Sequence, residues 1–130
     1  MSADNRHIRH GIGSVRPFID GQLDLLDFAT QVFRAVELER NRIDKGCRVR
    51  ARIGDSVVVL SAMDPPVQRG DTRVYVYVDD VDATHERAIS AGGVSLSKPS
   101  DRAFQEHTAG VKDSFGNLWY LAEYTGRAVH

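Results

Sequence analysis

The chain has 130 residues, of which 42% are hydrophobic and 27% charged, and its formal net charge is −1. These values are typical of one globular domain with an ordinary hydrophobic core. The near-neutral charge argues against a nucleic-acid-binding protein, and no apolar run approaches the ~20 residues of a membrane-spanning helix.

The start of the chain and its cysteine content indicate a cellular compartment. Residues 1–13 are polar and lack the apolar core of a signal peptide, so we expect a flexible N-terminal tail. Cys47 is the single cysteine, which excludes an intramolecular disulfide and fits a reducing environment. We therefore expect a cytoplasmic protein with no nucleic-acid or membrane partner.

A helix is predicted near the start of the chain, between a short strand and a hairpin. Within 23–35, apolar side chains recur at spacings of three and four, which is typical of a helix half-buried against a sheet. Asn41, Asp44 and Gly46 are turn-forming residues between two alternating segments, which indicates a hairpin. The helical stripe is Leu25, Phe28, Ala29, Val32 and Phe33, and the predicted strands are 15–19, 36–40, 47–53 and 57–63.

A linker rich in proline and charge, residues 64–71, separates two similar halves. After it an alternating strand leads into a helix, for which Asp80 or Asp82 is the expected N-cap and Gly92 and Gly93 the stop signal. The second half is predicted as a strand at 73–78, a helix at 82–91, a strand at 94–97, a loop at 98–104, and strands at 107–112 and 118–124.

Both halves have the order β-α-β-β-β, which is an internal repeat of about fifty residues. Each half has one amphipathic helix for one sheet, so one face of each sheet is left uncovered. The sequence therefore predicts an α+β fold of two βαβββ modules.

The order of these elements, with the segments VDDVDATHERAISAGG and VKDSFGNLWYLAEY, resembles the vicinal oxygen chelate superfamily. Within it, the chain is most similar to the glyoxalase/bleomycin-resistance/dioxygenase proteins of PhnB type. The resemblance implies one domain over 14–124, with modules 14–63 and 72–124 whose curved mixed sheets face a shared cleft, often in a homodimer, and a C-terminal tail at 125–130. Ser114 departs from the family pattern, which usually has proline there.

The resemblance also gives four positions to test for a metal. In metal-dependent members, a histidine and a glutamate from each module hold a divalent ion, and the matching residues here are Arg16, Val59, Arg73 and Tyr120. None is a plausible ligand for zinc or magnesium. His107 is the one histidine expected near the cleft, and one histidine does not make a metal site. We therefore expect neither a metal nor a cofactor.

Strand alternation predicts which side chains face the cleft. Arg73, Tyr75 and Tyr77 fall on one side of their strand and three valines on the other. The arginines of 47–53 face away from the helix, and Glu37 and Glu39 are expected to neutralise some of them. The predicted ligand-binding residues are Arg16, Phe18, Arg50, Val59, Ser61, Arg73, Tyr75, Tyr77, Leu118 and Tyr120.

An aromatic cleft with guanidinium groups favours a small planar or anionic ligand. The first hypothesis is a metal-independent protein that binds a small aromatic or anionic molecule, for sequestration or resistance. The alternative is a metal-independent, glyoxalase-like lyase or isomerase in which Tyr120 or His107 moves a proton. A metal-dependent lyase or dioxygenase is the third possibility, but it requires ligands that the four positions do not supply. The sequence leaves open whether the protein is an enzyme.

Overall fold

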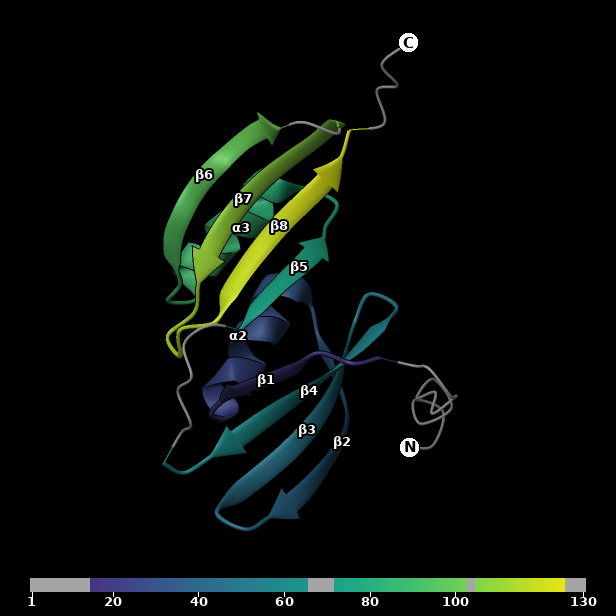
Figure 1. Ribbon diagram of the computed structural model, residues 1–130, viewed down its shortest axis with the longest axis vertical. Coiled ribbons are helices and arrows are strands. Elements are labelled where there is room, and N and C mark those ends of the chain that lie inside the picture. Colours follow the sequence, from purple (N-terminus) through teal and green to yellow (C-terminus); the bar gives the residue numbers. More distant parts are fainter. Residues whose placement is uncertain (1–14, 66–71, 103–104, 126–130) are drawn as a thin grey trace.

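The computed structural model describes residues 15–65, 72–102 and 105–125. It contains two four-stranded sheets, with strand orders β1-β4-β3-β2 and β5-β8-β7-β6. In each sheet the first strand is parallel to the fourth, and the other pairs are antiparallel. The predicted α+β fold of two βαβββ modules is therefore confirmed (Figure 1). The tails and most of the predicted linker lie outside the described residues.

The elements follow the predicted order. The first module holds β1 (Phe18–Gly21), α2 (Leu23–Phe33), β2 (Val36–Ile43), β3 (Gly46–Ile53) and β4 (Ser56–Met63). The second holds β5 (Arg73–Tyr77), α3 (Val81–Ser90), β6 (Val94–Arg102), β7 (Glu106–Lys112) and β8 (Leu118–Tyr124). No helix among the described residues is long and apolar enough to span a membrane.

Two predicted connections are shorter in the structure, because strand pairing extends into them. The predicted turn at 41–46 is reduced to Asp44 and Lys45, since Ile43 pairs with Gly46 and Lys45 takes a positive φ of 64°. The predicted loop at 98–104 is largely strand β6, which pairs with β7 as far as Arg102. Pro99 sits on this edge strand where the pairing is irregular, a place that tolerates a residue without an N–H.

The helix boundaries come from local signals. The Asp80 side chain accepts a hydrogen bond of 3.0 Å from the Ala83 N–H, so Asp80 is the N-cap of α3. Beyond the helix, Gly92 has a φ of +99° and Gly93 N–H donates to the Ala88 carbonyl, as in a glycine-terminated helix. Helix α2 ends at Phe33, because Arg34 adopts a left-handed conformation with a φ of 58°.

Helix α2 covers its own sheet and reaches the second module as well. Its buried residues pack with Ile19, Val49 and Leu60 of the first sheet, in a cluster that also contains Trp119. The Trp119 ring lies 5.0 Å from the Phe33 ring and 6.0 Å from the Phe28 ring. One continuous core therefore joins the modules, where the sequence had suggested one helix for one sheet.

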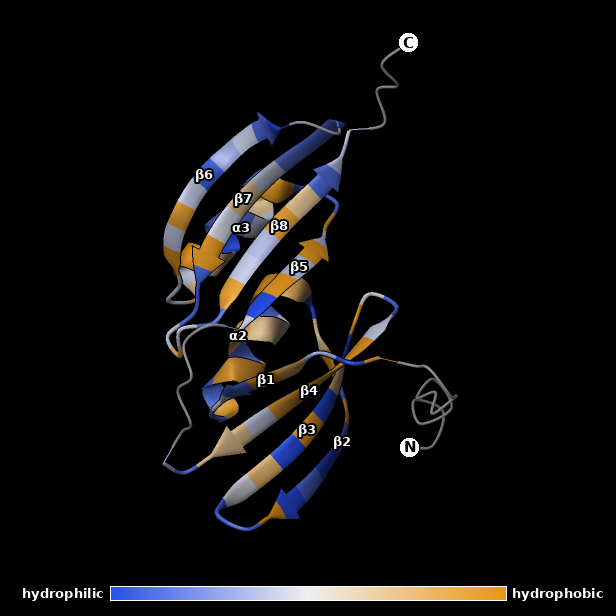
Figure 2. Ribbon diagram, in the orientation of Figure 1, coloured by the Kyte–Doolittle hydropathy of each residue, from blue (hydrophilic) through white to orange (hydrophobic). Residues whose placement is uncertain are grey.

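Polar contacts fix the same junction. The Asn117 side chain donates a hydrogen bond of 3.0 Å to the Asp20 carbonyl of β1, and Arg87 of α3 donates one of 3.0 Å to the Val32 carbonyl near the end of α2. Strands β1 and β5 form the two sheet edges nearest this junction (Figure 1). Figure 2 shows hydrophilic and hydrophobic residues alternating along β3, as expected for a strand with one face on the core.

Candidate functional site

The uncovered face of the second sheet carries the predicted aromatic residues. In the parallel pair β5–β8, Arg73 is in register with Leu118 and Tyr75 with Tyr120, so these side chains share one face. Trp119 and Leu121, on the other face of β8, are fully buried in the cores. The structure therefore brings the guanidinium group of Arg73 and the phenol of Tyr120 to the same side of the sheet.

The uncovered face of the first sheet is a surface of arginines over small or apolar residues. Phe18 and Arg50 are both in register with Val59, and Arg48 is in register with Ser61. Phe18 is 48% exposed, but Val59 and Ser61 are only 8% and 4% exposed. Phe18 is therefore open to a ligand, whereas Val59 and Ser61 lie on the predicted face but are largely covered by their neighbours.

The arginines of β3 have distinct environments. The Arg48 guanidinium lies 5.2 Å from the centre of the Phe18 ring, and Arg50 makes an ion pair of 2.8 Å with Glu39. Glu37 pairs with Arg40 of its own strand, because an irregularity between Glu37 and Glu39 shifts the register there. The prediction is therefore confirmed for Glu39, which pairs with Arg50, and wrong for Glu37.

Within the described part of the chain, the Nε–H groups of Arg48 and Arg50 have no acceptor. Both nitrogens are shielded from solvent, and neither has a hydrogen-bond partner among the described residues. Leaving a buried donor unpaired costs about 1–3 kcal/mol. An acceptor placed beside either Nε–H group would remove this cost.

Glu106, which the sequence analysis did not identify, lies at the start of β7 on the uncovered face of the second sheet. Its carboxylate accepts a hydrogen bond of 2.5 Å from the Tyr75 hydroxyl and one of 2.7 Å from the Tyr77 hydroxyl. Gly110 of β7 is in register with Tyr120 of β8, so every second residue of β7 from Gly110 lies on the same face as Tyr120. Glu106 is one of these residues. The bond to Glu106 raises the pKa of Tyr75 to about 12, and the two phenols lower the pKa of Glu106.

A cavity of about 910 Å³ lies between the modules. The segment before β1 and the turn between β3 and β4 form one wall of the cavity, and β5 forms another. Residues from the C-terminal end of α2 and from α3 complete the lining. Of the predicted ligand residues, Arg16, Tyr75 and Tyr77 line this cavity. Phe18, Arg50, Val59, Ser61, Arg73, Leu118 and Tyr120 lie outside its lining, on the uncovered sheet faces.

Comparison with known proteins identifies relatives. Protein Mb0911c of Mycobacterium bovis is 30% identical over 118 residues, which cover 81% of this chain and 78% of the mycobacterial protein. Protein Rv0887c of Mycobacterium tuberculosis is equally similar, with 69% of its length covered. The chain belongs to the same family as these mycobacterial proteins. No protein-family model matches it.

Solved structures establish the fold. TioX from Micromonospora sp. ML1 has a TM-score of 0.67 and 20% identity, covering 91% of this chain and 99% of TioX. A glyoxalase/bleomycin resistance protein/dioxygenase family enzyme from Burkholderia phytofirmans has a TM-score of 0.68 and 20% identity, covering 85% and 95%. The fosfomycin resistance protein FosX of Listeria monocytogenes has a TM-score of 0.66 and 14% identity, covering 89% and 94%. The fold is that of the glyoxalase/bleomycin-resistance/dioxygenase superfamily.

The four positions that bind metal in metal-dependent members of this superfamily do not suit a cation here. Arg16, Val59, Arg73 and Tyr120 offer two guanidinium groups, a hydrocarbon and a phenol, whereas divalent ions take histidine, thiolate or carboxylate ligands. Within the described residues, no group of three or more histidine, cysteine or acidic side chains is placed to hold a metal ion. The donor chemistry therefore does not fit the metal.

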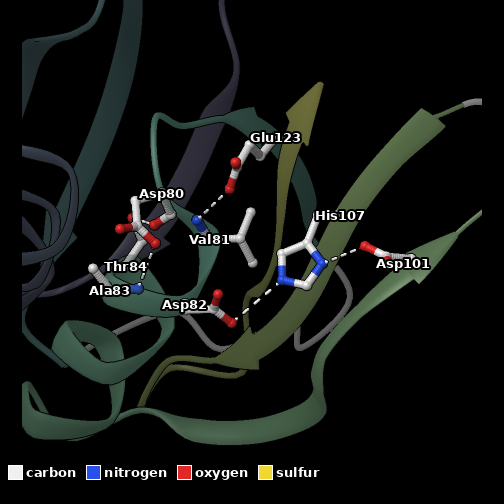
Figure 3. Close-up of polar contacts among 8 residues, drawn as sticks. All are labelled: Asp80, Val81, Asp82, Ala83, Thr84, Asp101, His107 and Glu123. Atoms are coloured by element: carbon white, nitrogen blue, oxygen red, sulfur yellow. Dashed lines mark hydrogen bonds and ion pairs between the residues drawn. The ribbon is translucent and has the colours of Figure 1, made fainter. Parts of the chain in front are cut away.

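His107 lies on the opposite face of the second sheet from Tyr120. It is in register with Glu123 and shares the helix-covered face with the buried Ala109. Its Nδ1 is 2.8 Å from an Asp101 oxygen and its Nε2 is 3.3 Å from an Asp82 oxygen (Figure 3). The prediction that His107 lies near the cleft is therefore wrong, because β7 places it on the side of α3.

His107 is expected to stabilise the protein more in acid than in base. The two aspartates raise its pKa above the ordinary value of about 6.5, so the protonated ring is favoured by folding. This contribution is fully present below pH ~6.5 and is lost as the pH rises through the folded-state pKa. Because both aspartates are largely exposed to solvent, it should be at most about 1 kcal/mol.

Urea unfolding of the wild type and the variant His107→Gln between pH 5 and pH 9 measures this effect. The difference in the free energy of unfolding should be largest near pH 5 and should shrink toward pH 9. A difference that stays constant across this range would show that the imidazolium–aspartate pairs do not contribute.

Proposed function

We propose that the protein binds a small aromatic or anionic molecule, without a metal ion, at the uncovered sheet faces and the cavity between the modules. The observation that carries this proposal is the position of Arg48 and Arg50 on the uncovered face of the first sheet, beside the exposed Phe18 ring. A carboxylate, phosphonate or enolate supplies the acceptors that a guanidinium group binds with parallel hydrogen bonds. The adjoining Phe18 ring, 48% exposed, offers a surface for a planar group.

The cavity supports an aromatic ligand of moderate size. Its volume of about 910 Å³ lies within the range of roughly 300–1,000 Å³ typical of small-molecule sites. Tyr75 and Tyr77 supply aromatic rings to its wall, and Arg16 supplies a positive charge from the other module. A ligand there would touch both modules at once.

A fosfomycin resistance protein is among the structural neighbours, and this likeness supports the proposal of a role in resistance. Sequestration requires a cleft and complementary groups, and the cavity between the modules and the arginines of β3 support such a role. We further propose that the protein forms a homodimer, which light scattering would detect as twice the mass of 14.4 kDa. The single cysteine supports a cytoplasmic location.

The structure favours binding over the alternative of a glyoxalase-like lyase or isomerase. His107 and Tyr120 lie on opposite faces of their sheet and do not act on one substrate atom. Tyr75, with its pKa raised to about 12, keeps its proton near neutral pH and is a poor general base. Tyr120 remains the candidate acid or base for that alternative, and loss of turnover in Tyr120→Phe would support it. A metal-dependent lyase or dioxygenase lacks its ligands at the four matching positions.

Removing the arginines should abolish tight binding of an aromatic acid. One charge-assisted hydrogen bond contributes about 1.5–3 kcal/mol, so Arg48→Ala and Arg50→Ala should each weaken binding by about 10- to 150-fold. Isothermal titration with a panel of benzoates and aryl phosphonates measures the loss.

Arg42→Ala is the matched control for this experiment. Arg42 is an exposed arginine of the same sheet, but its register with Cys47 places it on the opposite face. Its removal should leave binding unchanged. Equal affinity in all three variants, or a panel in which no acid binds the wild type, would contradict the proposal.

A further inference from the structure

We propose that Tyr75, Tyr77 and Glu106 form a subsite for an organic cation, such as an alkylated ammonium group. The ligand of the proposed function would then carry a cationic group as well as its anionic group. The inference rests on the proposed function only in assigning both groups to one molecule. The subsite itself follows from the geometry of the second sheet.

The carboxylate is held in a fixed position between two aromatic rings. Tyr75 donates its hydroxyl proton to one oxygen of Glu106 and Tyr77 donates to the other. A carboxylate has about four lone-pair positions, so each oxygen retains one for a further partner. The two rings are 5.6 Å apart in an edge-to-face arrangement, and they are 53% and 64% exposed. The rings and the remaining lone pairs are therefore open to a ligand.

Among the residues that the structure describes, no cation neutralises the negative charge of Glu106. Arg102 is its cross-strand neighbour, yet among the described residues no ion pair joins Arg102 or any other cation to Glu106. The phenols stabilise the ionised form, since they lower the pKa of Glu106, but they add no positive charge. A carboxylate that is ionised, immobilised and without a counter-ion attracts a cation.

The aromatic surroundings favour an organic cation over a hydrated inorganic ion. All four tyrosines of the chain lie on this face, because Tyr120 is in register with Tyr75 and Tyr124 with Glu106. The face of a phenol ring attracts an ammonium group electrostatically, and alkyl groups on that cation pack against the ring. One carboxylate with two rings matches such a group, whereas a divalent metal needs several anionic ligands.

The two charged groups of the ligand would contact different modules. The arginines with unpartnered donors belong to β3 of the first sheet, whereas the cation subsite belongs to β5 and β7 of the second. Tyr75 and Tyr77 also line the cavity between the modules, together with Arg16. Under the two proposals together, a zwitterionic aromatic molecule would meet an anion site in one module and a cation site in the other.

Titration of tetramethylammonium tests the subsite directly, with the neutral isostere 3,3-dimethylbutan-1-ol as the comparison. We expect the cation to bind the wild type at millimolar concentrations and at least tenfold more tightly than the alcohol, which corresponds to about 1.4 kcal/mol. Glu106→Gln should remove this preference. Glu86→Gln, which changes an exposed glutamate of α3, should retain it.

Two tyrosine variants keep the test decisive if Glu106→Gln folds poorly. Tyr77→Phe retains the ring and should keep the affinity for tetramethylammonium within about threefold, whereas Tyr77→Ala should lower it several-fold. Chemical-shift changes on titration should centre on β5 and β7. Equal affinity for the cation and the alcohol, no binding of the cation at 100 mM, or full binding by Glu106→Gln would each overturn the inference.

The two proposals fail in different experiments. Binding of aromatic acids depends on Arg48 and Arg50, and binding of tetramethylammonium depends on Glu106. If acids fail to bind but the cation binds in a Glu106-dependent way, the proposed anion site is wrong and the cation subsite stands. If acids bind and the cation does not, the cation subsite is wrong and the proposed function stands.

Discussion

Replacing Trp119 with alanine is expected to lower the free energy of unfolding by about 3–5 kcal/mol. The indole is fully buried and packs against the rings of Phe28 and Phe33 from the other module. Its Nε1–H also donates a hydrogen bond of 2.9 Å to Asp113. The substitution therefore creates a cavity at the junction and removes a donor from a buried carboxylate.

Urea denaturation at neutral pH measures this loss. Trp119→Phe keeps most of the volume but removes the N–H, so it should cost less, about 1–2 kcal/mol. Tyr124→Ala, on the exposed end of the same strand, should change the stability by about 0.5 kcal/mol or less. A loss below about 1 kcal/mol in Trp119→Ala would show that the two modules do not depend on this shared core.

Replacing Asp113 with alanine should cost about 3 kcal/mol, since several buried donors lose one common acceptor. Its Oδ1 accepts from the backbone N–H groups of Phe115 and Asn117, and its Oδ2 accepts from the Asn117 amide and the Trp119 indole. Asn117 in turn donates to the Asp20 carbonyl of the first module. Loss of the carboxylate therefore loosens the turn before β8 and one link between the modules.

Asp27→Ala is the control for this substitution. Asp27 is an exposed aspartate of α2, and its removal should change the stability by about 0.5 kcal/mol or less. Asp113→Asn keeps one acceptor oxygen and should fall between the two. Equal stability of Asp113→Ala and Asp27→Ala would show that water replaces the carboxylate in the turn at no cost.

These two substitutions also bear on the ligand site. Trp119 and Asn117 hold the second module against α2 and β1, and the cavity between the modules is lined by the end of α2, the segment before β1 and β5. A site whose walls belong to different modules depends on the junction for its shape. Ligand affinity should therefore fall with stability in Trp119→Ala.

Strand alternation was the most informative sequence signal for the site. The pattern of arginine and tyrosine against valine in 73–77 predicts which face of β5 is uncovered, and the structure agrees, because period-two geometry is a property of one strand. The same reasoning separates Trp119 from Tyr120. Along β7 the same alternation puts His107 on the helix-covered face and Glu106 on the uncovered face.

The boundaries of β2 and β6 are set by the neighbouring strands with which they pair rather than by their own residues. The segment 98–102 contains proline, serine and charge, which is typical of a loop, but β7 supplies the hydrogen-bond partners that make it strand. The segment 41–43 is extended for the same reason, since β3 pairs with it. Pairing between distant segments is not encoded in the composition of either one.

The sequence by itself determined the duplicated βαβββ order, the choice of Asp80 or Asp82 as the α3 N-cap, and the face of each side chain on β5 and β8, because these follow from periodicity and capping within one element. Only the tertiary structure decided that α2 packs on both modules, that Glu106 meets two tyrosines, and that Arg48 and Arg50 keep unpartnered donors. Each of these depends on which strands neighbour one another and how the sheets curve. Those are properties of the assembled chain, fixed by long-range packing and hydrogen bonding.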